Sequence, residues 1–186
     1  MGKLIYAMNV SLDGFVEGPG HDLGWANVEE ELHSWFNDRA REVQASLYGR
    51  RMYELMAGAW PDVAEDSAAP GYIRDFSRIW AETPKIVFSS TLESVAHNSR
   101  LVRGDVGEEL ERLRTEFDGD FDVGGPTLAA SFIRRGLIDE YWLLVHPVVI
   151  GAGTPFFPPL ERPMRLRLTE TRRFDSGVVY LGYSAR

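Results

Sequence analysis

Three segments of this sequence carry residue types that bind phosphate groups in proteins. Residues 49–51 read GRR, residues 89–91 read SST and residues 124–127 read GGPT, and each segment follows a short apolar run. Glycines let a backbone approach a ligand closely, and a helix that starts beside them presents free N–H groups to an anion. Arginines hold phosphates through paired hydrogen bonds, and hydroxyl groups bind ribose or phosphate oxygens. The chemistry indicated is nucleotide binding.

Each segment alone is also explained by a turn, because glycine after a strand usually serves only to reverse the chain. Three such segments at strand ends favour a nucleotide, since open α/β sheets bind ligands at the carboxyl ends of their strands. The GxGxxG fingerprint of the common dinucleotide-binding fold is absent. The site that we expect is therefore of another kind.

Acid–base chemistry has two candidate groups. Glu30 lies in a run of three glutamates that opens a predicted helix. His146 lies near the C-terminal end of a predicted strand, on the same face as Trp142 and Leu144. Acids at a helix start also complement the helix dipole in any protein, and a buried histidine can equally be a hydrogen-bonded core residue. The four histidines are scattered without the spacing of metal ligands, so we predict no metal site.

The elements that must position these groups alternate between strands and helices. Short apolar runs bounded by turn residues predict strands over 3–10, 46–48, 85–88, 121–123 and 140–150. Apolar residues at helical spacing predict helices over 28 to about 45, 52–56, 72–80, 106–117 and 126–135. Two final runs, 164–174 and 177–184, predict an antiparallel hairpin.

This alternation predicts an α/β fold of three layers, with a mostly parallel central sheet, helices on both faces and the hairpin at one edge. The length fits one domain, residues 1–186. The absence of cysteine excludes disulfides and thiol catalysis, and the net charge of −8 argues against nucleic acid as a partner. We expect a cytoplasmic protein with no membrane partner, since no signal peptide or long apolar span is found.

The same segments occur in this order in the dihydrofolate reductase-like superfamily, which the sequence resembles over almost its whole length. The matching stretches are LIYAMNVSLDGFVEG (4–18), YGRRMYE (48–54), KIVFSST (85–91), VGGPTL (123–128) and GTPFFP (153–158). More closely, the chain resembles the bacterial branch related to the riboflavin-biosynthesis reductase, or RibD C-terminal, domain. The resemblance implies the dihydrofolate reductase-like fold, NADPH as cofactor and a homodimer.

The resemblance also implies which residues bind NADPH and the substrate. Trp25 is similar to the tryptophan that flanks the substrate pocket in the family. The family segment that binds the phosphates matches Gly49, Arg50, Arg51 and Met52, and the segment that binds the adenosine ribose with its 2′-phosphate matches Ser89, Ser90 and Thr91. The segment under the pyrophosphate matches Gly124, Gly125, Pro126, Thr127 and Leu128. The residues that meet the nicotinamide match Asn9, Asp13, Gly14 and Val16.

Three departures from the family pattern concern function. Met52 replaces the usual threonine and so removes a hydroxyl contact with phosphate, and Pro126 removes a backbone donor beside the glycine pair. Leu32 stands at or beside the position where true dihydrofolate reductases carry the acid that holds the pteridine ring. Glu30 is one of three neighbouring acids that could substitute for it. A true dihydrofolate reductase is therefore not expected.

The function that we expect is an NADPH-dependent reductase that transfers hydride to a small heterocyclic or imine or carbonyl substrate. The nearest precedent implied by the resemblance is 5-amino-6-(5-phosphoribosylamino)uracil reductase activity in riboflavin biosynthesis. The alternative is a non-catalytic nucleotide-binding or dimeric module on the same fold. A third hypothesis is that the strand-end segments are turns and nothing more.

Overall fold

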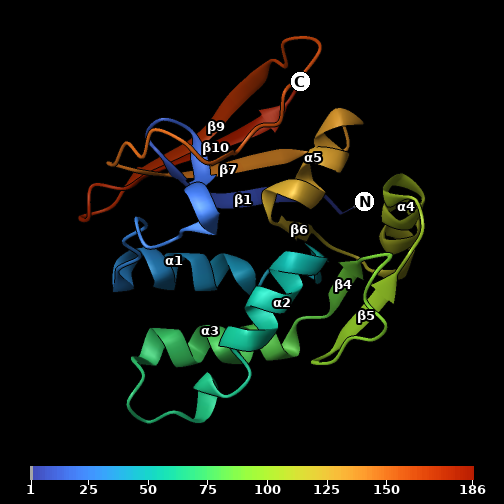
Figure 1. Ribbon diagram of the computed structural model, residues 1–186, viewed down its shortest axis with the longest axis horizontal. Coiled ribbons are helices and arrows are strands. Elements are labelled where there is room, and N and C mark those ends of the chain that lie inside the picture. Colours follow the sequence, from blue (N-terminus) through green and yellow to red (C-terminus); the bar gives the residue numbers. More distant parts are fainter. Residues whose placement is uncertain (1) are drawn as a thin grey trace.

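The protein is built around one large, mostly parallel sheet. The structure, a computed structural model, describes residues 2–186. Eight strands form the sheet in the order β5-β4-β3-β6-β1-β7-β10-β9 (Figure 1). The first six strands in this order are parallel, and β10 pairs antiparallel with both β7 and β9 at one edge. These strands are β1 (Leu4–Ser11), β3 (Ala45–Gly49), β4 (Lys85–Phe88), β5 (Ser99–Val102), β6 (Phe121–Gly124), β7 (Glu140–His146), β9 (Leu166–Arg173) and β10 (Val179–Ala185).

Helices cover both faces of this sheet, as the alternating pattern predicts. Figure 1 shows α1, α2 and α3 on one face and α4 and α5 on the other. Their bounds are α1 (Glu30–Ala40), α2 (Arg50–Ala59), α3 (Gly71–Glu82), α4 (Val106–Glu116) and α5 (Pro126–Arg134), and two short 3₁₀ turns cover Pro19–His21 and Val63–Glu65. The three-layer α/β fold is therefore confirmed.

Some predicted bounds were wrong. The first helix ends at Ala40 rather than near residue 45, because the chain must turn into β3 and Gln44 N–H already donates to Asp120 O beside the sheet. The strand predicted to reach residue 150 ends at His146, where Pro147 has no N–H for a ladder hydrogen bond. Three short strands were not predicted: β5, and the pair β2 (Phe15–Glu17) and β8 (Thr154–Pro155).

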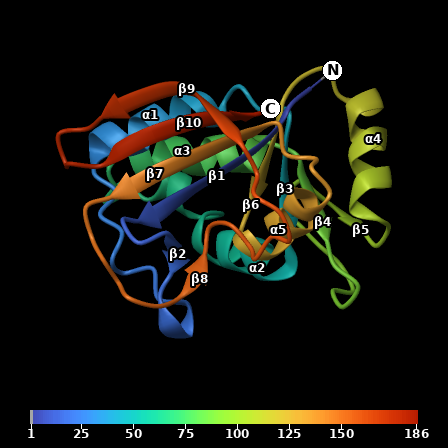
Figure 2. The ribbon, with the colours of Figure 1, turned by 90° about the horizontal axis from the view of Figure 1, so that it is seen from above.

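The pair β2–β8 forms a separate small antiparallel sheet. Figure 2 shows it close to the end of β1, on the side where the parallel strands have their carboxyl ends. These strands have three and two residues, and the periodicity of such short runs does not distinguish them from loops. The small sheet nevertheless matters for the site, because it carries Glu17.

The core is divided between the two faces. On the face of α4 and α5, one large cluster includes Leu47, Leu110, Val123 and Phe132. On the other face there are two clusters. One packs α1 against β7 and β10 around Trp35 and Tyr180, and the other packs α2 and α3 against β3 and β4, with Tyr48 and Trp80 among its members. The space between these two clusters is not filled.

Candidate functional site

A cavity of about 510 Å³ lies on the α1–α3 face, between the two core clusters of that face. The sheet has small residues at this point, since Ala7 in β1 and Gly124 in β6 directly follow the paired residues Tyr6 and Val123. On the next strands outward, Tyr48 of β3 lies opposite Gly124 and Trp142 of β7 lies opposite Ala7, so these two aromatic residues bound the space on either side. Two small residues on adjacent central strands thus leave room for a ligand.

The walls of the cavity are mainly aromatic. Four of the five tryptophans of the chain contribute to them. The aromatic lining consists of Trp25, His33, Phe36, Tyr48, Trp60, Phe76, Trp80 and Trp142. A mostly apolar cavity with few polar groups is the usual form of a small-molecule site in proteins.

Asp122 is the one acid among the described residues that line this cavity. It lies in β6 opposite Ser46 of β3, whose hydroxyl donates a hydrogen bond of 2.6 Å to Asp122 Oδ1. Burial raises the pKa of Asp122 to about 6, although the hydrogen bond from Ser46 opposes this rise. Asp122 is not among the site residues predicted from the sequence. The sequence feature that could have revealed Asp122 is an acid between the apolar residues Phe121 and Val123 of a predicted buried strand.

His146 lies beside the cavity, with its ring against two residues that line it. The side chain is buried, and its Nε2 atom is 2.9 Å from Asn9 Oδ1. The ring of Trp25 packs edge-on against it, with 5.5 Å between ring centroids. Burial lowers the pKa of His146, so a neutral ring is favoured at pH 7, and in the Nε2–H tautomer it donates to Asn9. Its geometry suits positioning of Asn9 and Trp25.

The three predicted phosphate-binding segments meet at one edge of the sheet. They end the neighbouring strands β4, β3 and β6, and Arg50 Nη1 donates to Thr91 Oγ1 over 3.1 Å. Helices α2 and α5 start directly after Gly49 and Gly125, and neither start is capped by a side chain. The first N–H groups of these helices are thus not satisfied by a side-chain cap, and such groups can bind a polyphosphate. In α5 these donors begin at Thr127, because Pro126 has no N–H.

Within these segments the side chains have different surroundings. Arg50, Ser90, Thr91 and Thr127 are exposed, whereas Leu128 is buried in the core. The Ser89 hydroxyl accepts hydrogen bonds from the N–H groups of Thr91 and Leu92, and so shapes the turn after β4. The exposed members are therefore the ones that can reach a ligand.

Arg51 has a partner within the protein. Its Nη2 atom donates to both carboxylate oxygens of Glu17 over 2.8 Å, and its Nη1 atom contacts His21. Glu17 is buried and accepts a further hydrogen bond of 2.6 Å from Thr154. Burial raises the pKa of Glu17, but the hydrogen bonds from Arg51, Thr154 and His21 outweigh it, so the net pKa lies below the usual value. This cluster attaches the small β2–β8 sheet to α2.

The remaining predicted residues are not all at the cavity. Asn9, Val16, Trp25, Met52 and Gly124 line it. Asp13 instead accepts hydrogen bonds from the N–H groups of Ile150 and Gly151, next to the turn at Gly14, and so holds the loop after β7. Glu30 is exposed on the first turn of α1 and does not line the cavity, whereas Leu32 does.

Gly125 is the N-cap of α5 and has a φ of +89°, which only glycine adopts without strain. A Cβ atom here would lie 3.3 Å from Met52 Cβ. We expect Gly125→Ala to lower the free energy of unfolding by about 1–3 kcal/mol, as measured by urea denaturation. Gly136→Ala is the matched control, because its φ is +67° but an added Cβ would meet nothing within 4 Å. Equal losses in the two variants would exclude a contribution from the Met52 contact.

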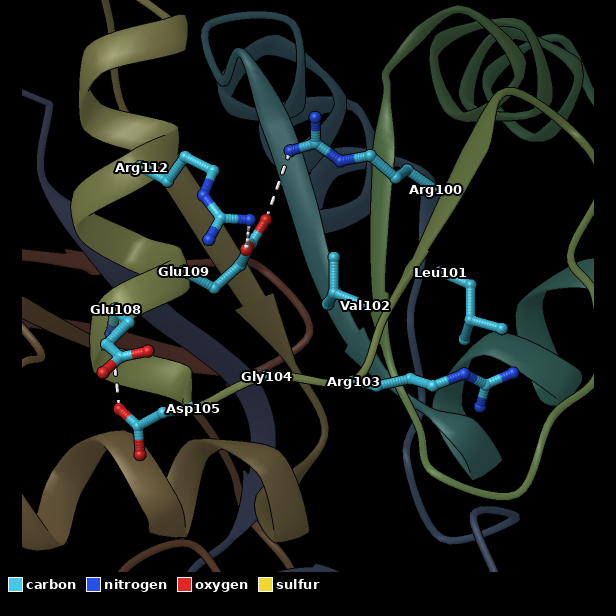
Figure 3. Close-up of a pocket in the computed structure, with 9 residues that line it drawn as sticks. All are labelled: Arg100, Leu101, Val102, Arg103, Gly104, Asp105, Glu108, Glu109 and Arg112. Carbon is cyan, nitrogen blue, oxygen red and sulfur yellow. Dashed lines mark hydrogen bonds and ion pairs between the residues drawn. The ribbon is translucent and has the colours of Figure 1, made fainter.

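A second, shallower pocket of about 300 Å³ lies between β5 and α4 (Figure 3). Two of its three arginines have an acidic partner, since Glu109 accepts from Arg100 at 3.4 Å and from Arg112 at 2.9 Å. The third, Arg103, donates to the carbonyl oxygens of Ser89 and Leu92. This pocket shares no lining residue with the aromatic cavity.

Across residues 2–186, no group of three or more potential metal-ligating side chains and no membrane-spanning helix is found.

Comparison with known proteins agrees with this architecture. Residues 2–180 match the RibD C-terminal domain family. The chain belongs to this family. Among its relatives is the Bacillus subtilis (strain 168) protein YyaP, which is 30% identical over 182 residues that cover 97% of this chain and 94% of YyaP.

Solved structures of RibD-type proteins share the fold. A putative riboflavin biosynthesis protein from Shewanella sp. PV-4 aligns with a TM-score of 0.76 at 19% identity, covering 100% of this chain and 99% of that chain. The deaminase/5-amino-6-(5-phosphoribosylamino)uracil reductase from Thermotoga maritima aligns with a TM-score of 0.68 at 15% identity, covering 100% of this chain and 57% of that chain. Membership of the RibD C-terminal domain family supports a reductase-like role.

Proposed function

We propose that this RibD C-terminal domain protein is an NADPH-dependent reductase of a small heterocyclic, imine or carbonyl compound. The proposal rests on one observation: the strand-end hydrogen-bond donors and the aromatic cavity meet at Gly124. The strand-end donors that suit a dinucleotide lie at the edge of β4, β3 and β6, and the aromatic cavity begins at the same end of β6. A cofactor bound along the edge would thus adjoin a compound in the cavity.

The chain's own groups suit NADPH. The uncapped starts of α2 and α5 would hold its phosphates, and Arg50 with the hydroxyl of Thr91 would hold the phosphate on the adenosine ribose. NADPH, when bound, supplies a hydride. The aromatic walls exclude water from the reacting groups, and His146 fixes the amide of Asn9 at the cavity.

Titration of tryptophan fluorescence with NADPH and with NADH tests the cofactor assignment. We expect NADPH to bind about tenfold more tightly than NADH, and Arg50→Ala to remove this preference, because one charged hydrogen-bonding group contributes about 1.5–3 kcal/mol. Arg134→Ala, at an exposed arginine in the last turn of α5, is the matched control and should change neither affinity. Equal affinities in the unaltered protein would reject the assignment of Arg50.

A second candidate function is a non-catalytic nucleotide-binding module. The position of Leu32 favours it, since an apolar side chain lines the cavity where true dihydrofolate reductases carry an acid. The module predicts NADPH binding without NADPH oxidation by any pterin, pyrimidine or quinone. Oxidation of NADPH with one of these compounds, followed at 340 nm, would exclude it.

The homodimer also remains a proposal, which light scattering on the purified protein would test.

A further inference from the structure

The cavity carries one carboxyl group that has no counter-charge. Asp122 accepts hydrogen bonds from the Ser46 hydroxyl and from its own backbone N–H, and no ion pair of its carboxyl is found within residues 2–186. Lys85 lies two strands away in the same row of the sheet, but its Nζ donates to Trp80 O and lies 4.1 Å from the centre of the Trp80 ring. An isolated carboxylate in such surroundings is costly, and the neutral acid is therefore favoured.

A neutral carboxylic acid has an O–H group that can donate a hydrogen bond. The Ser46 hydroxyl donates to Oδ1 of Asp122, which leaves Oδ2 available to carry this proton. Ile5, the residue opposite Asp122 on β1, is apolar and offers no acceptor. Because Asp122 lines the cavity, an O–H group on Oδ2 can donate to an acceptor atom of a compound that fills the cavity.

We propose that the cavity binds a flat, uncharged ring compound and that Asp122, as a protonated acid, donates a hydrogen bond to an acceptor atom on its edge. Only the identification of this compound as the substrate rests on the proposed function. Binding of the compound does not, because it requires no cofactor. The aromatic walls favour flat rings, because these stack against or pack edge-on to aromatic side chains.

The surroundings of the one arginine in the cavity argue for an uncharged compound. The guanidinium carbon of Arg39 is 3.8 Å from the centre of the Trp35 ring, and its Nη2 is 3.1 Å from Glu170 Oε1. Arg39 thus already has an acidic partner and a stacking partner. No lysine and no other arginine is among the described lining residues. A phosphate-bearing compound would find no free cation inside the cavity.

Other titratable groups near Asp122 must be separated from it in any pH experiment. Those lining the cavity are His33 and Arg39 on α1 and Tyr48 on β3, and Lys85 lies in the same row of the sheet. Burial lowers the pKa of His33 and raises that of Tyr48 beyond the range of the experiment. Burial also lowers the pKa of Lys85 to about 8. The competitors between pH 5 and pH 7 are therefore His33, which lines the cavity, and His146, which contacts Asn9 and Trp25 beside it.

Coumarin and naphthalene are suitable probes, because both are flat two-ring compounds without a titratable group and only coumarin carries a carbonyl acceptor. Their affinities would be measured by quenching of tryptophan fluorescence and by calorimetry, without cofactor, at pH 5 and pH 7. We expect coumarin to bind about tenfold more tightly at pH 5, and naphthalene to bind equally at both. In Asp122→Asn the amide donates at every pH, so coumarin binding should stay tight and lose its pH dependence.

Two control variants complete the test. Asp62→Asn, at an exposed aspartate in the loop after α2, and His33→Gln should both keep the pH dependence of coumarin binding. No coumarin binding, equal coumarin affinities at the two pH values, or loss of the pH dependence in His33→Gln alone would each overturn the proposal. Failure of NADPH to bind would reject the proposed function and leave these results unaffected, so the two failures can be told apart.

Discussion

Replacing Asp122 by asparagine should stabilise the protein at pH 8 by about 2–3 kcal/mol and leave its stability at pH 4 almost unchanged. The reason is that burial raises the pKa of this carboxyl from its ordinary 3.8 to about 6. Such a difference corresponds to about 3 kcal/mol between the two protonation states. Asparagine has the same shape and can still accept the hydrogen bond from Ser46, but it never ionises.

The sign follows from proton binding. Between pH 3.8 and about 6, the folded state holds the proton of Asp122 more tightly than the unfolded state does, so stability falls as the pH rises through this window. Below it both states are protonated, and the residue contributes nothing. Above it the cost of the buried charge is complete. The asparagine variant avoids this cost and should gain its full advantage above pH 7.

Urea denaturation at pH 4, 6 and 8 measures this effect. Taking the difference between variant and unaltered protein at each pH cancels the titration of all other groups, provided that they do not interact with residue 122. Asp62→Asn should show no pH-dependent difference, since Asp62 is exposed. A variant that is less stable than the unaltered protein at pH 8 would show that Asp122 is held as a charged group by a partner that outweighs burial.

The backbone architecture could largely be predicted from the sequence, because it depends on local periodicity. The stripe of Val106, Leu110, Leu113 and Phe117 predicts α4 closely, and it packs as a helix should. The strand-end segments could be placed for the same reason. In a parallel sheet, consecutive strands bring their carboxyl ends to one edge, so their contact follows from the order of elements.

The chemistry inside the cavity could not be predicted in this way. The cavity exists because Ala7 and Gly124, which are far apart in the chain, are small and lie on adjacent strands. Only the register of β1 against β6 reveals that Asp122 lines this space. The acids near Glu30, by contrast, were visible in the sequence but are exposed, because the side of α1 that faces the sheet is apolar.

The partner of Arg51 was hidden for the same reason, since Glu17 lies 34 residues earlier in a three-residue strand. Arg50 and Arg51 belong to the same predicted phosphate-binding segment, but the structure gives them different roles. Arg50 is half exposed and pairs with the exposed Glu54, whereas Arg51 neutralises a buried carboxylate. This difference yields a prediction that does not depend on any ligand.

Replacing Arg51 by alanine should lower the free energy of unfolding by about 2–3 kcal/mol at pH 7. The side chain of Glu17 is only 8% exposed, and without Arg51 the hydrogen bonds that remain to its carboxylate within residues 2–186 come from Thr154 and His21. Removal of one partner from a buried ion pair typically costs about 3–5 kcal/mol, and the half-exposed position of Arg51 admits water and reduces this. Urea denaturation measures the loss.

Arg50→Ala is the matched control, because an exposed pair contributes about 0–1 kcal/mol and its removal leaves no buried charge. The double variant Glu17→Gln, Arg51→Ala should recover part of the lost stability, since a neutral amide needs no counter-charge. If both single arginine variants were equally stable, Arg51 would have to be a surface residue in solution and free to bind phosphate. A large loss that the double variant reverses would instead make Arg51 the residue that holds the β2–β8 sheet to α2, and would leave Arg50 as the arginine available to a cofactor.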